Sequence, residues 1–201
     1  MKKITTKAII TARKAVEKDR KYGSYSSIEK IIYKKYKYNK DPAIVALKIA
    51  YIDQTNSTNL RMDKNITIAK LAEKIMKIDF DRRIRKGDLT LVDEIASMGD
   101  RKLLSFASKY CLYHNHNGYN KDDFSIYDSI VRNTLPGLLK DIGIKKTKTE
   151  LCDYTEYCNA INSLIEHYGL NSLEHPRRDL DWYIWWNYRR QASPTLKNET
   201  K

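Results

Sequence analysis

Cysteine, glycine and proline are scarce in this chain, and no stretch is continuously apolar over membrane-spanning length. Seven glycines and four prolines among 201 residues argue against a disordered chain and against a β-rich fold with many tight turns. The three cysteines, Cys111, Cys152 and Cys158, lack the spacing of a zinc or iron–sulfur site and predict a reduced, cytoplasmic protein. Because no apolar run or leader is apparent, we expect no membrane partner.

Positive charge is the strongest compositional feature of the chain. The 38 lysines and arginines outnumber the 25 aspartates and glutamates, which gives a formal net charge of +13. Such a charge favours a polyanionic partner, most often nucleic acid. The alternative interpretation is compositional, because abundant Lys, Asn, Ile and Tyr are also typical of proteins from AT-rich genomes.

Apolar residues recur at helical spacing along nearly the whole chain, which predicts an all-α fold of about eight to ten helices. Asp41 followed by Pro42 is a strong start for a nearly apolar, central helix that runs to about Ile52. A break is predicted at Gly23–Ser27, and the charged stretch Asp79–Asp88 is predicted to be an exposed linker or a phosphate contact. The predicted segments are a basic helical segment over 1–40, a main helical domain over 41–190 and a polar tail over 191–201.

One lysine and one aspartate stand out in the stretch from Ser105 to Val131. Lys109 lies among apolar and small residues on a predicted helix, and a buried lysine is costly unless a partner or a reaction uses it. Such a lysine shifts its pKa readily and can act as an amine nucleophile. Asp128 opens the next apolar run, where its carboxylate could hold the charge of the lysine, take its proton or stabilise a developing cation. Asp123 is predicted to cap that second helix.

The same stretch resembles the core of the helix-hairpin-helix DNA glycosylase superfamily, in particular its 8-oxoguanine-glycosylase-like branch. In that branch a catalytic lysine lies on the helix after a hairpin, and a catalytic aspartate follows at the start of another helix. Lys109 and Asp128 match this pair in type, order and separation. Residues 91–98, Gly99–Asp100 and 101–113 match the helix, the hairpin and the second helix, although this hairpin has one glycine and no proline.

The resemblance extends over residues 42–187 and implies an enzyme that excises a damaged or modified base from double-stranded DNA. The biological task would be DNA repair or defence against phage DNA. The base is first flipped out of the stack; Lys109 then attacks the sugar C1′, and Asp128 stabilises the positive charge that grows on the sugar. The Schiff base left on the lysine would permit strand cleavage, which is AP-lyase activity. The scheme implies a monomer that needs no metal and no cofactor.

The predicted hairpin supplies the first candidates for DNA binding. Backbone N–H groups at Gly99 and just after it would lie at the start of a helix, where they suit a phosphate. Arg101 and Lys102 add positive charge beside them.

Two amide side chains after the apolar helix are further candidates. In the related endonuclease III type of glycosylase, a glutamine just after this helix wedges into the duplex where the base leaves. Gln54 matches that place approximately, with Asn56 as the second choice. The alternative is that Asp53–Asn59 forms an ordinary hydrogen-bonded turn.

A base pocket is predicted from Asp53, Trp185 and Trp186. Adjacent tryptophans on one helix cannot both face one core, so one of them is available to a groove. In the superfamily the C-terminal helix can border the pocket of the flipped base, whereas aromatic residues on helices more often belong to a core.

Other functions remain open at this point. The altered hairpin and the positive charge also suit a non-catalytic nucleic-acid-binding helix-hairpin-helix module, and a third reading is an interaction protein whose charge is compositional. His114-Asn115-His116-Asn117 invites an HNH-nuclease or metal site. It follows a helix, where that nuclease needs a strand hairpin, and two histidines make a weak metal site. We therefore expect exposed loop residues there and no bound metal.

Overall fold

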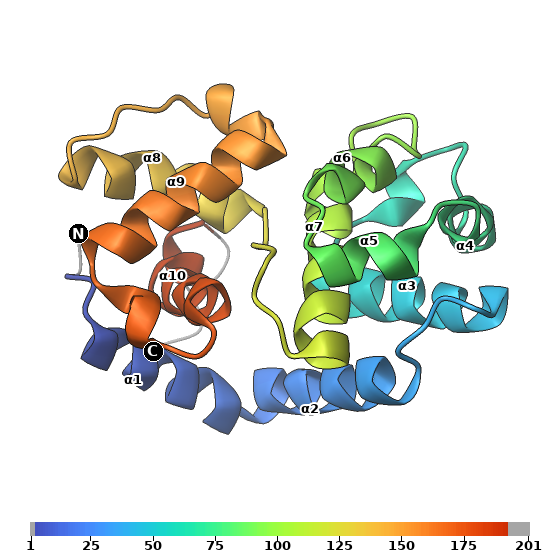
Figure 1. The fold of residues 1–201 in the computed structure, drawn as a ribbon, viewed down its shortest axis with the longest axis horizontal. Coiled ribbons are helices and arrows are strands. Elements are labelled where there is room, and N and C mark those ends of the chain that lie inside the picture. Colours follow the sequence, from blue (N-terminus) through green and yellow to red (C-terminus); the bar gives the residue numbers. More distant parts are fainter. Residues whose placement is uncertain (1–2, 193–201) are drawn as a thin grey trace, which may run out of the picture. The chain divides into compact units, whose positions relative to one another are not determined.

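The computed structural model describes residues 3–192, and every regular element in that range is helical. The all-α prediction is therefore confirmed for the described residues, while residues 193–201 of the predicted tail lie outside them. The α-helices (Figure 1) are α1 (Thr6–Lys18), α2 (Arg20–Lys35), α3 (Pro42–Asn56), α4 (Ile68–Met76), α5 (Phe80–Lys86), α6 (Thr90–Ala96), α7 (Leu104–Tyr113), α8 (Ser129–Asp141), α9 (Tyr154–His167) and α10 (Pro176–Ala192). The short elements are η1 (Leu60–Met62), the π-helical η2 (His114–Gly118), η3 (Glu150–Cys152) and η4 (Leu170–Ser172).

The chain folds as two compact units, of which one is continuous in the sequence and the other is built from two separate stretches. Unit 2 is the continuous stretch 24–126, whereas unit 1 combines residues 1–23 with residues 127–201. The predicted N-terminal segment 1–40 thus contributes to both units. None of the described helices has both the length and the apolar character that crossing a bilayer requires.

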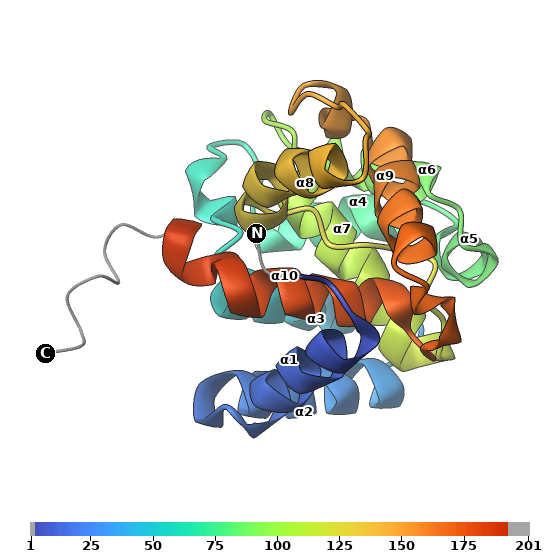
Figure 2. The same cartoon turned by 90° about the vertical axis from the view of Figure 1, so that its left-hand side faces the viewer.

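Unit 1 is built around α10, which packs against α1, α8 and α9 (Figures 1 and 2). The buried face of α1 consists of Ile9, Ala12 and Val16. Arg13 of α1 forms an ion pair at 3.0 Å with the buried carboxylate of Asp179 on α10. A buried carboxylate needs such a partner, so this ion pair fixes α1 against the C-terminal helices.

The predicted break at Gly23–Ser27 is wrong, because α2 runs through it from Arg20 to Lys35. The chain turns earlier, at Asp19, whose side chain accepts hydrogen bonds from the backbone N–H groups of Lys21 and Tyr22, each at 3.0 Å. Gly23 allows the backbone of α2 to lie close to the end of α1, because a Cβ at this position would collide with the Glu17 carbonyl oxygen.

Unit 2 packs α3 against α4 and α7, and α6 against α7. Asp41 caps α3 as predicted, with its Oδ1 accepting from the Ala43 N–H at 2.8 Å. α7 is the most enclosed helix, because every residue from Phe106 to Tyr113 is buried. The predicted linker at 79–88 is instead the short helix α5, which buries Phe80 and Ile84 on one face. Their spacing of four residues places both on one side of a helix, which explains why so charged a stretch is helical.

Candidate functional site

Lys109 lies in the middle of α7, surrounded by buried and mostly apolar side chains. Lys109 itself is 4% exposed. Its amine donates to the Ser105 hydroxyl at 2.9 Å and to the Ser105 carbonyl oxygen at 3.3 Å, one turn earlier on the same helix. Both of these acceptors are neutral, so they orient the amine without holding its positive charge as a carboxylate would. α7 thus presents the buried, oriented amine that the sequence predicted.

Asp128 is the N-cap of α8 in unit 1. Its Oδ1 accepts a hydrogen bond from the Val131 N–H at 2.9 Å, and its side chain is half-buried. The predicted cap at Asp123 is wrong, because residues 121–128 are not helical and the Asp123 carboxylate accepts from the Asn115 side-chain amide at 2.8 Å instead. Lys109 belongs to unit 2, whereas Asp128 belongs to unit 1. The pairing of Lys109 with Asp128 therefore stays a prediction.

The backbone N–H groups of the loop between α6 and α7 already bind an anionic side chain of the protein, the carboxylate of Asp63. One Asp63 carboxylate oxygen accepts from the backbone N–H groups of Asp100 at 2.8 Å and Arg101 at 3.4 Å, and the other accepts from the Asn65 N–H at 3.2 Å. Burial raises the pKa of Asp63, but hydrogen bonds from backbone N–H groups outweigh this effect and lower the pKa overall. A Cβ at Gly99 would press on the same carboxylate. A phosphate at the predicted N–H groups would therefore have to displace Asp63.

The two basic residues of this loop have different roles. α7 begins at Leu104, so Arg101 and Lys102 precede the helix that was predicted to begin with them. The Arg101 guanidinium donates to the carbonyl oxygens of Thr58, at 3.1 Å, and Asn59, and so ties the loop to the segment after α3. Lys102 is exposed and pairs with the half-buried Asp93 at 3.1 Å. An exposed ion pair of this kind is weak, which leaves Lys102 the better placed of the two for an outside anion.

Of the polar residues 53–59, which were predicted to follow the apolar helix, residues 53–56 belong to its last turn. α3 continues past Ile52 to Asn56, and Ser57 ends it with a left-handed φ of 50°. The Asp53 Oδ1 accepts from the Thr58 hydroxyl at 2.7 Å and from the Leu60 N–H at 3.0 Å. Asp53 therefore organises the turn after α3, in addition to its predicted role in a base pocket.

The two wedge candidates differ in exposure. Asn56 is half-buried, and its Oδ1 accepts from the Tyr113 hydroxyl of α7 at 3.0 Å. Gln54 is exposed. Since a wedge must reach outside the protein, Gln54 remains the first choice and Asn56 links α3 to α7.

The predicted pocket tryptophans of α10 surround an arginine in unit 1. Trp185 and Trp186 are both half-exposed. The guanidinium carbon of Arg189 lies 4.4 Å from the ring centroid of Trp185 and 3.9 Å from that of Trp186, which is cation–π geometry. Tyr22 packs edge-on against Trp185, with ring centroids 4.4 Å apart. Asp53 lies in unit 2, so no single unit brings the three predicted pocket residues together.

A second buried lysine, which the sequence analysis did not single out, lies on α3. Lys48 is 0% exposed, and its amine donates to the Asn39 Oδ1 at 3.0 Å and to the Tyr38 carbonyl oxygen at 3.4 Å. Burial lowers the pKa of Lys48 to about 7, because removal from water disfavours the charged amine. The available signal was the one used for Lys109, a single lysine inside an apolar run, here residues 43–50.

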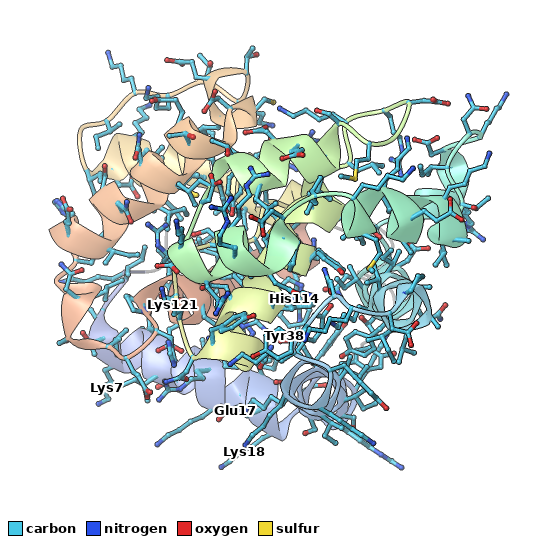
Figure 3. The ribbon with its side chains drawn as sticks, turned by 45° about the vertical axis from the view of Figure 1, so that its right-hand side comes forward. Lys7, Glu17, Lys18, Tyr38, His114 and Lys121 are labelled. Carbon is cyan, nitrogen blue, oxygen red and sulfur yellow. The ribbon has the colours of Figure 1, made fainter. Side chains whose placement is uncertain are left out.

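An aromatic cage that includes His114 lies beside Lys48 (Figure 3 labels His114). The amine is 5.7 Å from the Tyr33 ring centroid. The imidazole packs against Tyr33, Phe80 and Tyr110, with centroid distances of 4.8, 4.6 and 4.7 Å. Burial lowers the pKa of His114 well below its usual value, so the ring is neutral at pH 7. The predicted exposed loop at 114–117 is wrong, because η2 extends α7 without a break, buries His114 and Asn115, and leaves His116 and Asn117 half-buried.

Comparison with known proteins places the chain in a family. The model of the HI_0787_N family, described as an N-terminal domain, matches residues 5–122, and the chain belongs to that family. A Haemophilus influenzae protein described as uncharacterized is 31% identical over 140 residues, which are 67% of this chain and 64% of that protein. The chain thus spans less than two thirds of the length of this relative. No solved structure matches the chain.

Proposed function

We propose that the protein is a DNA glycosylase of the helix-hairpin-helix type, and that the same lysine supports AP-lyase chemistry. The observation that carries the proposal is the buried, oriented amine of Lys109 on α7, directly after the turn that follows α6. The N-cap position of Asp128 supports it further, because the resemblance places the second catalytic residue at the start of a helix.

In the proposed reaction, the neutral amine of Lys109 attacks C1′ of the flipped nucleotide. The N-glycosidic bond breaks, and the base leaves with the electron pair and takes up a proton. Asp128 stabilises the positive charge on the sugar during this step. The sugar ring then opens to a Schiff base on Lys109, and loss of a C2′ proton with cleavage of the C3′–O bond cuts the strand. Ser105 orients the amine for the attack.

The DNA contact in this proposal relies on basic side chains and not on the N–H groups of the loop. Those N–H groups are bonded to Asp63, whereas Lys102 is exposed and the chain carries a net charge of +13. Phosphate contacts by lysine and arginine provide affinity without sequence preference. Gln54, exposed at the end of α3, is the proposed wedge.

The rival is a non-catalytic nucleic-acid-binding module. It is favoured by the bonds of the Lys109 amine to Ser105, since a structural lysine can be satisfied within its own helix in the same way. The two functions differ in whether an amine of the protein forms a covalent bond with the sugar.

Borohydride trapping on a duplex with an abasic site tests the proposal, because borohydride reduces a lysine Schiff base to a stable adduct. The parent protein should form the adduct, and Lys109→Gln should lose it while keeping its helical content and melting temperature. Lys48→Met is the matched control, since it removes the other buried lysine of unit 2. Trapping that survives in Lys109→Gln and disappears in Lys48→Met would move the nucleophile to Lys48. A parent protein that binds DNA without any adduct would favour the rival.

A further inference from the structure

Hydrogen-bond donors outnumber acceptors around Lys48 in unit 2. The Lys48 amine has two neutral acceptors, the side-chain oxygen of Asn39 and the carbonyl of Tyr38. The Asn39 oxygen also accepts from the Tyr110 hydroxyl at 3.2 Å, so both of its lone pairs are used. Within residues 3–192, no carboxylate forms an ion pair with Lys48. The interior of unit 2 thus contains an ammonium group without a counter-charge in contact.

Two further side chains of this cluster carry a buried polar atom without a hydrogen-bond partner inside the described chain. They are the Tyr33 hydroxyl and the Asn39 amide nitrogen. The two residues are 0% and 9% exposed. Buried polar groups are nearly always hydrogen-bonded, so these atoms point to a ligand that accepts hydrogen bonds. The His114 ring, by contrast, has a hydrogen bond to the Lys37 backbone, which raises its pKa against the effect of burial.

The two carboxylates near the cluster accept hydrogen bonds from groups other than the Lys48 amine. Both oxygens of Asp81 on α5 accept from the backbone N–H of Asn39 at 3.2 Å. Glu29 on α2 accepts from the Asn117 side-chain amide at 2.7 Å. The remaining titratable groups that face Tyr33 are phenols, those of Tyr51, Tyr110 and Tyr113. Asp81 raises the pKa of Lys48 through its charge, against the effect of burial. Among the described residues, however, neither Asp81 nor any other carboxylate forms an ion pair with the amine.

We propose that the Lys48 cluster is a binding site for a small monovalent anion, with chloride as its ligand in solution. A chloride ion would accept hydrogen bonds from the Lys48 amine, the Asn39 amide and the Tyr33 hydroxyl, and its charge would balance the ammonium. Water fits less well, because it would bring two more donors to a cluster that already has too many. The site uses none of the residues assigned to DNA chemistry.

Anion binding at this site is linked to the protonation of Lys48. Burial lowers the pKa of Lys48 to about 7, so the amine is charged below pH 7 and neutral well above it. The anion binds the charged amine, so its stabilising effect is present at low pH and disappears as pH rises. Burial lowers the pKa of His114 well below its usual value, so the imidazole does not titrate together with Lys48.

Thermal unfolding of the full chain in sodium chloride and in sodium gluconate at equal ionic strength tests this site. Gluconate is a much larger monovalent anion than chloride, so it controls for screening. At about pH 6 we expect chloride to raise the melting temperature by about 2–4 °C relative to gluconate, and at about pH 9 the difference should disappear. Lys48→Met should lose the chloride effect, and Lys70→Met, which removes an exposed lysine of α4, should keep it.

A second variant keeps the test decisive if Lys48→Met does not fold. Tyr33→Phe removes one donor and retains the ammonium, and it should reduce the chloride effect without abolishing its pH dependence. Equal melting temperatures of the parent in the two salts at low pH would overturn the proposal and leave water as the ligand. A chloride effect that persists in Lys48→Met would also overturn it, because the anion would then bind elsewhere.

Discussion

Replacing Lys48 by methionine should stabilise the protein, although the substitution removes two hydrogen bonds. Lowering a lysine pKa from 10.5 to about 7 corresponds to about 5 kcal/mol of lost stability when the amine is charged. Methionine has a similar length and no charge, so it avoids this cost. The Asn39 oxygen keeps its bond from Tyr110, and the lost bonds to the amine cost about 1–2 kcal/mol together. At pH 7 the amine of the folded protein is only about half charged, so the cost is about 4 kcal/mol. The net expectation at this pH is a gain of about 2–3 kcal/mol.

The pH dependence of this gain has a definite sign. The unfolded chain binds a proton on Lys48 up to its ordinary pKa, whereas the folded chain releases it from about pH 7. Folding stability therefore rises with pH between these two values in the parent protein. By pH 10 the cost of the buried amine should have fallen to about 1 kcal/mol, so the advantage of Lys48→Met should largely vanish.

Urea unfolding at pH 7 and pH 10, in a chloride-free buffer, measures both quantities. The midpoint of Lys48→Met should exceed that of the parent at pH 7, and the two midpoints should converge at pH 10. A variant that is less stable than the parent at pH 7 would refute the reasoning. So would an advantage of equal size at both pH values, because it would not come from the titration of Lys48.

Three further predictions concern the proposed DNA chemistry and the loop before α7. Asp128→Asn keeps a good helix cap, so it should bind an abasic-site analogue normally while single-turnover excision falls by ~100-fold; a joint loss of binding and stability would indicate a structural residue. Gly99→Ala should lower the free energy of unfolding, measured in urea, by about 1–3 kcal/mol. Gly118→Ala should lower it far less, because its added Cβ would be 3.7 Å from its nearest neighbour. Equal losses in the two variants would contradict the packing of Gly99 against Asp63. DNA affinity should fall linearly with salt on a log–log plot, and Lys102→Ala should weaken the binding of all sequences alike. A flat salt response or an altered sequence preference would count against phosphate contacts.

Local patterns allowed the start of α3 and the burial of Lys109 to be predicted. Asp41 followed by Pro42 predicts the start of a helix, and in the structure Asp41 is the N-cap of α3. Lys109 is surrounded by apolar neighbours in the sequence, and it is buried. Both features depend on residues within about one helical turn, which is the range over which sequence periodicity carries information.

Features that depend on distant residues could not be predicted in the same way. Asp63 accepts from the Asp100 N–H across 37 positions, and nothing in the sequence around Gly99 indicates that an internal carboxylate fills the place expected for a phosphate. The burial of His114 similarly depends on Tyr33 and Phe80, which come from α2 and α5. Lys48 is different, because its burial is indicated locally by a single lysine within the apolar run 43–50.

The order in which the chain can fold follows from the way unit 1 is assembled. Arg13 and Asp179, which join α1 to α10, are 166 positions apart, whereas unit 2 consists of one continuous stretch. During synthesis, α1 is made before unit 2, and its apolar face of Ile9, Ala12 and Val16 lacks its main partner helix until α10 has been made. Unit 2 can complete its own contacts during that interval. α1 is thus among the last of the described helices to reach its native contacts, and until then its apolar face is a surface through which the nascent chain can aggregate.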